Sequence, residues 1–312
     1  MPWKENYTAS DEIGLRDDQV RWPGDRRCCV VVNVDLSLAR GPDGLREKDL
    51  NDDRAMFGRR EGMSQLLATL ARFDIKATFT VPGVMAGMLG DSLRELILDG
   101  HEVAAHGFKH EDVATLSRDE EKARMDLTTE ILTRVLGKQP SGWYSLPRQN
   151  DPFAVGTISP HTMELAIEAG YRYFGNGLSD DIPHYWVANF ERRSAILTMP
   201  YFYHFDDQFF LLFPAKGTGL EHADTLFANW RAEFDAQYKR GRHFNMTLHP
   251  HAIGWCNRIK LLEDFFGHMR SLPDVWTPTA GQCADYWLET YPAATHLHLE
   301  ASIWQDYPGS FS

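Results

Sequence analysis

The sequence has no long apolar run. No stretch of the 312 residues approaches the roughly 20 consecutive apolar residues that a helix needs to cross a bilayer. The opening segment, Met1 to Arg27, is polar and charged and lacks the apolar centre of an export signal. We therefore expect a cytoplasmic protein without a membrane partner.

Basic residues are also scarce. The chain has 32 Lys and Arg against 44 Asp and Glu, a formal net charge of −12. Nucleic acids and anionic membranes are bound through clustered Lys and Arg, and the sequence contains no such cluster. This composition argues against a nucleic-acid partner and leaves a small molecule as the expected substrate.

Cysteine is rare as well. The four cysteines, Cys28, Cys29, Cys256 and Cys283, have no paired metal-binding spacing. Cys28 and Cys29 are adjacent, so in a strand their side chains would point to opposite faces. In a cytoplasmic compartment free thiols are the expected state.

What the sequence has is enough length and apolar content for one large core. With 43% hydrophobic residues, a single barrel-like domain accounts for the length. We expect an N-terminal arm at 1–27, a catalytic domain at 28–290 and a C-terminal tail at 291–312. The arm and the tail would either wrap around a neighbouring subunit or be disordered ends.

Short apolar runs alternate with longer amphipathic ones along the chain. The run CCVVVNVD at 28–35 is continuous and β-branched, which predicts a strand covered on both faces. Further strands are expected at 76–81, 102–105, 171–174, 196–199 and 243–249. Helices are expected at 60–73, from the turn at 82–83 to about 100, and at 223–239, 258–269 and 279–289.

Two further helices carry start signals. Ser117 to Glu120 forms a capping-box pattern, and Gly137 closes the helix, with Ala123, Leu127, Ile131 and Val135 expected on its buried face. Ser159 and Pro160 predict an N-cap and first helical residue for a helix to about 170.

This alternation predicts a mostly parallel sheet, closed or nearly closed, with helices outside. In such folds functional residues gather at the carboxyl ends of strands. Asp35, His106, Ser145 and His249 all lie at or just after a predicted strand end. The segment 175–203 has no clear pattern, and we interpret it as an active-site loop or a subunit contact.

A metal site is the first functional hypothesis. Asp35 and the His-x-x-x-His pair, His106 and His110, supply three ligands, the number that a catalytic ion uses when one position stays open for water. Zn2+ is the expected ion, with Mn2+, Co2+ and Ni2+ as alternatives for this ligand set. The alternative is a surface pair of histidines and a carboxylate that caps a strand end.

The motif LHPH places two more histidines near the same edge. His249 has the intrinsic pKa range of a general acid, whereas a structural histidine packed on Pro250 is the alternative. For His251 a supporting role and a structural role stay open. Asn33, two residues before Asp35, is a candidate to position water or substrate, or a buried strand residue bonded to the backbone.

The remaining candidates lie outside this group. Trp143, Tyr144 and Ser145 follow a strand and are expected to line the substrate pocket or to belong to the core. Arg258 is expected to bind a carboxylate product or to form a structural salt bridge. Paired acids are more often solvated or ion-paired than catalytic, and that is the expectation for Asp180, Asp181, Asp206 and Asp207.

Taken in order, the motifs resemble the polysaccharide deacetylase (NodB homology) superfamily, and more closely its allantoinase-like and cyclic imide hydrolase branch. The resemblance covers roughly residues 28–287 and rests on VNVDLS, FGRREG, KATFTVPG, HEVAAHGFKHED, GWYSLPR, SPHTMELAIEAGYRY and FNMTLHPHAIGWCNRIKLLEDFF. It implies a distorted (β/α) barrel, one divalent metal held by Asp35, His106 and His110, His249 as general acid, and a homotetramer.

The chain departs from the family pattern at two positions. Asn33 stands where the family usually has a catalytic-base Asp, and Tyr144 stands where the deacetylases often have an Arg that orients the base. An amide cannot accept a proton near neutral pH. A natural Asn33 indicates a changed substrate, whereas an engineered replacement of Asp is the other explanation.

The chemistry of the leaving group suggests which substrate. An imide nitrogen leaves as a resonance-stabilised anion and needs less proton assistance than a plain amide. We therefore predict a metal-dependent hydrolase that opens a small cyclic imide or cyclic amide to a half-amide. The alternatives are an N-deacetylase of an acetylated sugar or small amide, and a catalytically silent metal-binding protein.

Overall fold

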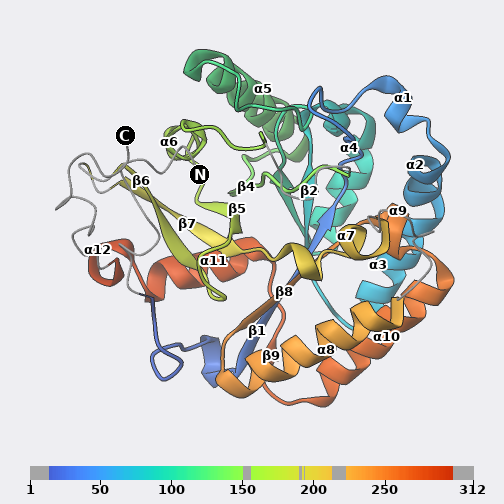
Figure 1. Ribbon diagram of the computed structural model, residues 1–312, viewed down its shortest axis with the longest axis vertical. Helices are drawn as coiled ribbons and strands as arrows, with labels where there is room; N and C mark the ends of the chain where they lie inside the picture. Colours follow the sequence, from blue (N-terminus) through green and yellow to red (C-terminus); the bar gives the residue numbers. More distant parts are fainter. Residues whose placement is uncertain (1–13, 150–155, 190–191, 193, 213–222, 298–312) are drawn as a thin grey trace, which may run out of the picture.

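The computed structural model describes residues 14–149, 156–189, 192, 194–212 and 223–297. Its core is one curled sheet with helices around it (Figure 1). In the described part of the chain, no helix is both long enough and apolar enough to cross a bilayer.

The elements follow one another in the β-then-α order that the sequence predicts. The strands are β1 (Cys28–Asp35), β2 (Ala77–Val81), β3 (Glu102–Ala105), β4 (Gly142–Trp143), β5 (Tyr173–Gly177), β6 (His184–Asn189), β7 (Ser194–Pro200), β8 (His243–Leu248) and β9 (Val275–Trp276). The α-helices are α1 (Glu47–Leu50), α2 (Asp53–Phe57), α3 (Met63–Arg72), α4 (Gly83–Leu98), α5 (Arg118–Leu136), α6 (Thr162–Glu168), α7 (Asp207–Leu212), α8 (Ala223–Arg240), α9 (Pro250–Ile253), α10 (Cys256–Ser271), α11 (Ala280–Thr290) and α12 (Ala293–His296). Shorter turns are η3 (Pro23–Asp25), the π-helical η4 (Gly58–Gly62) and η5 (Tyr203–Phe205).

The sheet is a distorted, mostly parallel barrel, as predicted. Its strand order is β6-β7-β5-β4-β3-β2-β1-β8, with β9 added to β1. Neighbouring strands are parallel except β6, which runs antiparallel to β7. Near β8 an isolated parallel bridge joins Asp206 to Thr247, so the chain after β7 returns to the far edge of the sheet.

Strand β1 separates two apolar cores. Cys28, Val30, Val32 and Val34 pack with the outer helices, whereas Cys29 and Val31 belong to a second cluster. That second cluster also takes in residues of β3, β5, β6 and β7 and the helix α11. The alternation of strand side chains therefore puts Cys29, Val31, Asn33 and Asp35 on one face of β1.

The described part of the N-terminal segment packs on this second cluster. Val20 and Trp22 are buried there, 5% and 3% exposed, and the Trp22 ring lies 5.4 Å from that of Trp287 on α11. Residues 1–13 and 298–312 lie outside the described chain, so the predicted roles of the arm and the tail stay predictions.

The start and end of α5 are as predicted, but its buried face is different. Ser117 accepts from the N–H of Glu120, and Gly137 ends the helix with φ of 77°. The buried residues are Glu121, Met125, Thr128 and Leu132, whereas Leu127 is 39% exposed and Ala123 is exposed. The pattern of apolar residues did not predict the buried face correctly, because that face contains the polar Glu121. The Glu121 carboxylate accepts hydrogen bonds from hydroxyls near α6.

The helix α6 begins later than predicted. It starts at Thr162 with His161 as its N-cap residue, and Ser159 Oγ instead accepts from the N–H of His161 in a turn before the helix. The strand expected at 171–174 is β5, which begins at Tyr173 and runs on to Gly177. Ser159 therefore accepts a backbone hydrogen bond as predicted, but it caps a turn that precedes the helix and not the helix itself.

The segment 175–203 is not a loop. It contains the end of β5 and two further strands, β6 and β7, so the prediction of an irregular segment was wrong, although β7 confirms the strand expected at 196–199. The sequence of β6 shows no alternation of apolar and polar residues, because the strand is buried on both faces over its first half, at His184 and Tyr185. A hydrophobic pattern of period two is lost in a strand covered on both sides.

The helix expected at 60–73 begins earlier, because α2 and the π-helical η4 precede α3. Two glycines of η4 lie against α9. A Cβ on Gly58 would meet the backbone and Cβ of His251, and one on Gly62 would meet the backbone of Pro250. The glycines of the FGRREG motif therefore allow η4 to pack closely against the LHPH motif.

Candidate metal centre and active site

The carboxyl ends of β1, β3, β4 and β8 meet at one end of the barrel and bring four polar side chains together. Asp35 ends β1, and His106 directly follows β3. Tyr144 directly follows β4, and His249 directly follows β8. Each of these side chains is buried, with only 1% exposed.

One carboxylate oxygen of Asp35 accepts hydrogen bonds from the protein, and the other faces two imidazole rings. The hydroxyl of Thr80 and the N–H of Ser37 donate to Oδ1, at 3.0 and 2.8 Å. Oδ2 lies 3.4 Å from Nε2 of His106 and 3.4 Å from Nε2 of His249. Burial raises the pKa of Asp35, but the two imidazoles outweigh burial and hold its pKa well below the usual value. Asp35 is an ionised carboxylate that faces two imidazole nitrogens.

His106 has the orientation of a metal ligand. Its Nδ1 lies 3.2 Å from the carbonyl oxygen of Tyr144. A carbonyl only accepts, so Nδ1 carries the proton and Nε2 keeps its lone pair. Among the described residues, this buried Nε2 has no hydrogen-bond partner. A backbone carbonyl that fixes one nitrogen while the other faces a carboxylate is typical of metal-binding histidines, so His106 and Asp35 fit a metal ion.

His110 lies beside His106, with ring centroids 4.0 Å apart, but both of its nitrogens are occupied. The hydroxyl of Ser37 lies 2.7 Å from Nδ1, and Nε2 lies 2.6 Å from the carbonyl oxygen of Leu146. Nε2 therefore donates and Nδ1 accepts, which leaves no lone pair free. Burial and the neighbouring His106 hold the pKa of His110 well below its usual value. His110 belongs to the site, and its role as third metal ligand stays a prediction.

His249 is fixed by the carboxylate of Asp207, for which the sequence analysis expected no catalytic role. Its Nδ1 lies 2.7 Å from Oδ1 of Asp207, and its backbone N–H donates to the same carboxylate. Asp206 Oδ1 lies 3.6 Å from the same Nδ1. Burial lowers the pKa of His249, but the Asp206 charge and the Asp207 hydrogen bond together raise it well above the usual value. This pairing aims Nε2 at Asp35.

The two adjacent aspartates, Asp206 and Asp207, are fully buried and therefore not solvated, but both lie within ion-pair distance of His249, as the ion-paired alternative predicts. Burial raises the pKa of Asp206 to about 7. With His249 they form a group whose ligand atoms lie within 4.8 Å of one another, so this group is also able to hold a cation. For Asp180 and Asp181 the expectation is confirmed, because both pair with Arg242 at 2.6 and 2.5 Å.

Asn33 lies two residues before Asp35 on the same face of β1. The Tyr144 hydroxyl donates to its Oδ1 at 3.0 Å. The two departures from the family pattern therefore contact each other. Burial raises the pKa of Tyr144 well above its usual value, so its hydroxyl keeps the proton that it donates. The amide oxygen is occupied, which leaves the amide N–H groups of Asn33 as donors for another partner.

The other sequence candidates surround this centre. His251 accepts from Gln149 at 2.8 Å, and burial lowers its pKa to about 3. Trp143 and Ser145 are 6% and 5% exposed. Arg258 is buried on α10, where it donates to the carbonyl of Ala252 at 2.6 Å.

Two clefts reach the centre from different sides. One is lined by Asp35, Pro250 and His251, together with Leu36, Leu38, Ala55, Gly58, Arg59, Met63, Met85, Leu89 and Ser92. The other is lined by His106, His110 and Tyr144, together with residues that include Trp143, Ser145, Phe108, Glu111, Val113, Glu121 and Arg124. Trp143, Tyr144, Ser145 and His251 thus line clefts beside the candidate centre, whereas Arg258 lines neither.

The sequence and the fold can be compared with those of known proteins. Residues 51–174 match the polysaccharide deacetylase family model. A peptidoglycan deacetylase of Helicobacter pylori is 23% identical over 292 residues, which cover 84% of this chain and 97% of the relative. A crystal structure described as a polysaccharide deacetylase of Mycobacterium smegmatis is 25% identical with a TM-score of 0.71, covering 86% of this chain and 92% of that one.

The chain is similar in sequence and fold to polysaccharide deacetylases. The fold is also shared with the Puue allantoinase, at a TM-score of 0.75 and 23% identity, over 90% of this chain and 95% of that chain. This similarity to deacetylases supports metal-dependent hydrolysis of amide C–N bonds.

Proposed function

We propose that this protein hydrolyses the C–N bond of a small cyclic imide or cyclic amide and releases the ring-opened half-amide. The observation that carries the proposal is the convergence of Asp35, His106 and the Asp207-bound His249, with Asn33 in the position of the usual base. The buried carboxylate and the unpaired imidazole nitrogen fit a divalent ion, Zn2+ by preference.

In this proposal Asp35, His106 and His110 hold the ion. His110 has to exchange its hydrogen bond to Leu146 or to Ser37 for that role. When bound, a divalent ion supplies a Lewis acid for the carbonyl and a water whose pKa is lowered to about 7. That chemistry removes the need for a strong protein base, which this chain lacks at residue 33.

The chain's own residues position the substrate and move one proton. Asp207 holds the His249 ring so that Nε2 faces the carboxylate of Asp35. From there His249 donates a proton to the departing nitrogen as the C–N bond breaks. Asn33, anchored by Tyr144, donates a neutral hydrogen bond to substrate or water.

Two features favour a small ring over a polymer. The site is deeply buried, since Asp35, His106 and His249 are each 1% exposed, and a small substrate suits such a site better than a polymer chain. In addition, an imide nitrogen leaves as a stabilised anion, so a site with an amide at residue 33 loses less with this substrate than with an N-acetyl group.

The test is a parallel assay of the metal-loaded protein with succinimide, hydantoin, allantoin and an N-acetylated oligosaccharide. Ring opening, detected by mass spectrometry as the gain of one water (the half-amide of succinimide, or the ureido acid of hydantoin or allantoin), supports the proposal. Acetate release without ring opening contradicts it.

The second candidate is an N-deacetylase. It is favoured by the H. pylori relative, which is a peptidoglycan deacetylase and aligns along nearly its whole length. The same assay decides between the two, because acetate release and ring opening are separate products.

A further inference from the structure

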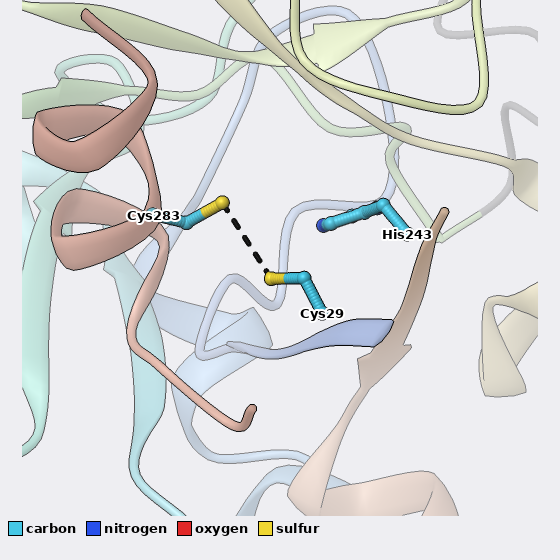
Figure 2. Close-up of side chains that lie close together, drawn as sticks. All are labelled: Cys29, His243 and Cys283. Carbon is cyan, nitrogen blue, oxygen red and sulfur yellow. Dashed lines mark hydrogen bonds between the residues drawn. The ribbon is translucent and has the colours of Figure 1, made fainter. Parts of the chain in front are cut away.

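A second cluster of potential metal ligands lies at the opposite end of the barrel from the site just described. Cys29 is near the beginning of β1, His243 begins β8, and Cys283 is on α11. Figure 2 shows the three side chains pointing toward one another from these separate elements. Because Cys29 and Asp35 share one face of β1 and are six residues apart, their backbones are separated by about 20 Å.

The geometry of the cluster suits a thiophilic ion. The two sulfur atoms are 3.6 Å apart, and the three potential ligand atoms lie within 4.8 Å of one another. Two thiolates bound to one tetrahedral Zn2+ at about 2.3 Å would be roughly 3.8 Å apart. The cluster is therefore already near the size that a zinc ion requires.

His243 supplies an independent observation. It is 2% exposed, and neither Nδ1 nor Nε2 has a hydrogen-bond partner among the described residues. Its ring is flanked by the apolar Trp22, with centroids 6.3 Å apart. A buried imidazole with two unsatisfied nitrogens costs free energy, so such groups in folded proteins usually bind a partner. A metal on one nitrogen provides that partner.

Charge balance also favours an ion here. Cys29 and Cys283 are both 0% exposed, so neither thiol would ionise alone in this apolar setting. When Zn2+ binds, each thiol loses one proton, and two thiolates neutralise the doubly charged ion. The neutral imidazole of His243 completes a three-ligand set with no net charge.

We propose that Cys29, His243 and Cys283 bind a Zn2+ ion that joins α11 to β1 and β8, with a water molecule as the fourth ligand. The ion ties α11 to the start of the barrel, far from the proposed catalytic centre.

The decisive experiment is absorption spectroscopy of the Co2+-substituted full-length protein. Thiolate ligands give a sulfur-to-cobalt charge-transfer band in the near ultraviolet, whereas a centre of carboxylate and imidazole ligands gives none. We expect the band in the wild type and in Cys28→Ser, a matched control because Cys28 is equally buried but faces the other core. Cys29→Ser and Cys283→Ser should lose the band and about one equivalent of bound metal.

A measurement on the wild type keeps the test independent of variant folding. A mercurial reagent titrated into the zinc-loaded protein should release zinc in step with loss of buried thiols. Absence of the charge-transfer band, release of no zinc with the thiols, or a disulfide between Cys29 and Cys283 in the purified protein would each overturn the proposal.

Discussion

His249 Nδ1 lies 2.7 Å from Oδ1 of Asp207, and both residues are at most 1% exposed. The bond fixes which nitrogen of His249 faces the carboxylate of Asp35. Asp207 is therefore a positioning residue, and its neighbour Asp206, 3.6 Å from the same nitrogen, offers a matched comparison.

Asp207→Asn should lower kcat by about 10²- to 10⁴-fold, because the amide can no longer fix the tautomer that the proton transfer needs. KM should change little, since Asp207 does not reach the substrate. Asp206→Asn should have a smaller effect on kcat. Steady-state kinetics of both variants, with circular dichroism to confirm folding, checks this; equal losses in both would contradict the role of Asp207.

Asn33→Asp should weaken ring opening rather than improve it. The substitution adds a charge to a buried site within reach of Asp35, and it replaces a hydrogen-bond donor with a group that only accepts. The measurement is kcat/KM on the best imide substrate beside acetate release from an N-acetylated sugar. A gain in imide hydrolysis would mean that the position serves as a base, and that the asparagine is an impaired form.

Metal content separates the predicted ligands from the predicted acid. Asp35→Asn, His106→Gln and His110→Gln should each lower bound divalent metal by about one equivalent, whereas His249→Gln should retain it and lose only activity. Elemental analysis after dialysis gives the result. If His249→Gln loses the metal and His110→Gln keeps it, His249 is the third ligand and a different group must donate the proton.

The buried face of α5 can be tested with two leucines of one helix. Leu132→Ala should lower the free energy of unfolding by about 2–5 kcal/mol, because its side chain is fully buried, whereas Leu127→Ala, 39% exposed, should cost less than about 1 kcal/mol. Urea denaturation checks both. Similar losses of unfolding free energy at the two positions would support the buried face that the sequence predicted, which included Leu127.

His101 gives the protein a specific dependence on pH. Its Nδ1 accepts a hydrogen bond from the N–H of Ala77 at 3.0 Å, and burial followed by the nearby Lys76 lowers its pKa below the usual 6.5. The folded state therefore favours the neutral ring, so this contribution to stability is present above pH 6.5 and is lost as pH falls below it. His101→Asn keeps an acceptor that does not titrate, and its midpoint of thermal unfolding should fall less between pH 7 and pH 5 than that of the wild type. An equal fall in the midpoint of thermal unfolding in the wild type and in His101→Asn would contradict the role of His101.

Much of the fold follows from local pattern. The β-branched run of β1 and the capping box of α5 each act over a few residues, so a single sequence predicts their elements. The strand β6 was missed because its burial depends on partners distant in sequence, whereas β7 was predicted over its central residues, 196–199.

The site shows the same division. Asp35, His106 and His249 were found because each directly ends or follows a strand that the sequence predicts. The role of Asp207 was missed because it depends on the chain after β7 crossing to β8, a long-range contact that an adjacent acid pair does not indicate. The Cys29–Cys283 approach was missed for a similar reason, since the two residues are 254 positions apart.

The most direct test of the central claim is the product formed from a cyclic imide by the metal-loaded wild type and by Asp35→Asn. The account predicts that the wild type converts succinimide to its half-amide, or hydantoin or allantoin to its ring-opened ureido acid. Chelation should abolish the reaction, added Zn2+ should restore it, and Asp35→Asn should be inactive in all conditions. Persistence of ring opening after complete removal of metal, or in Asp35→Asn, would contradict it.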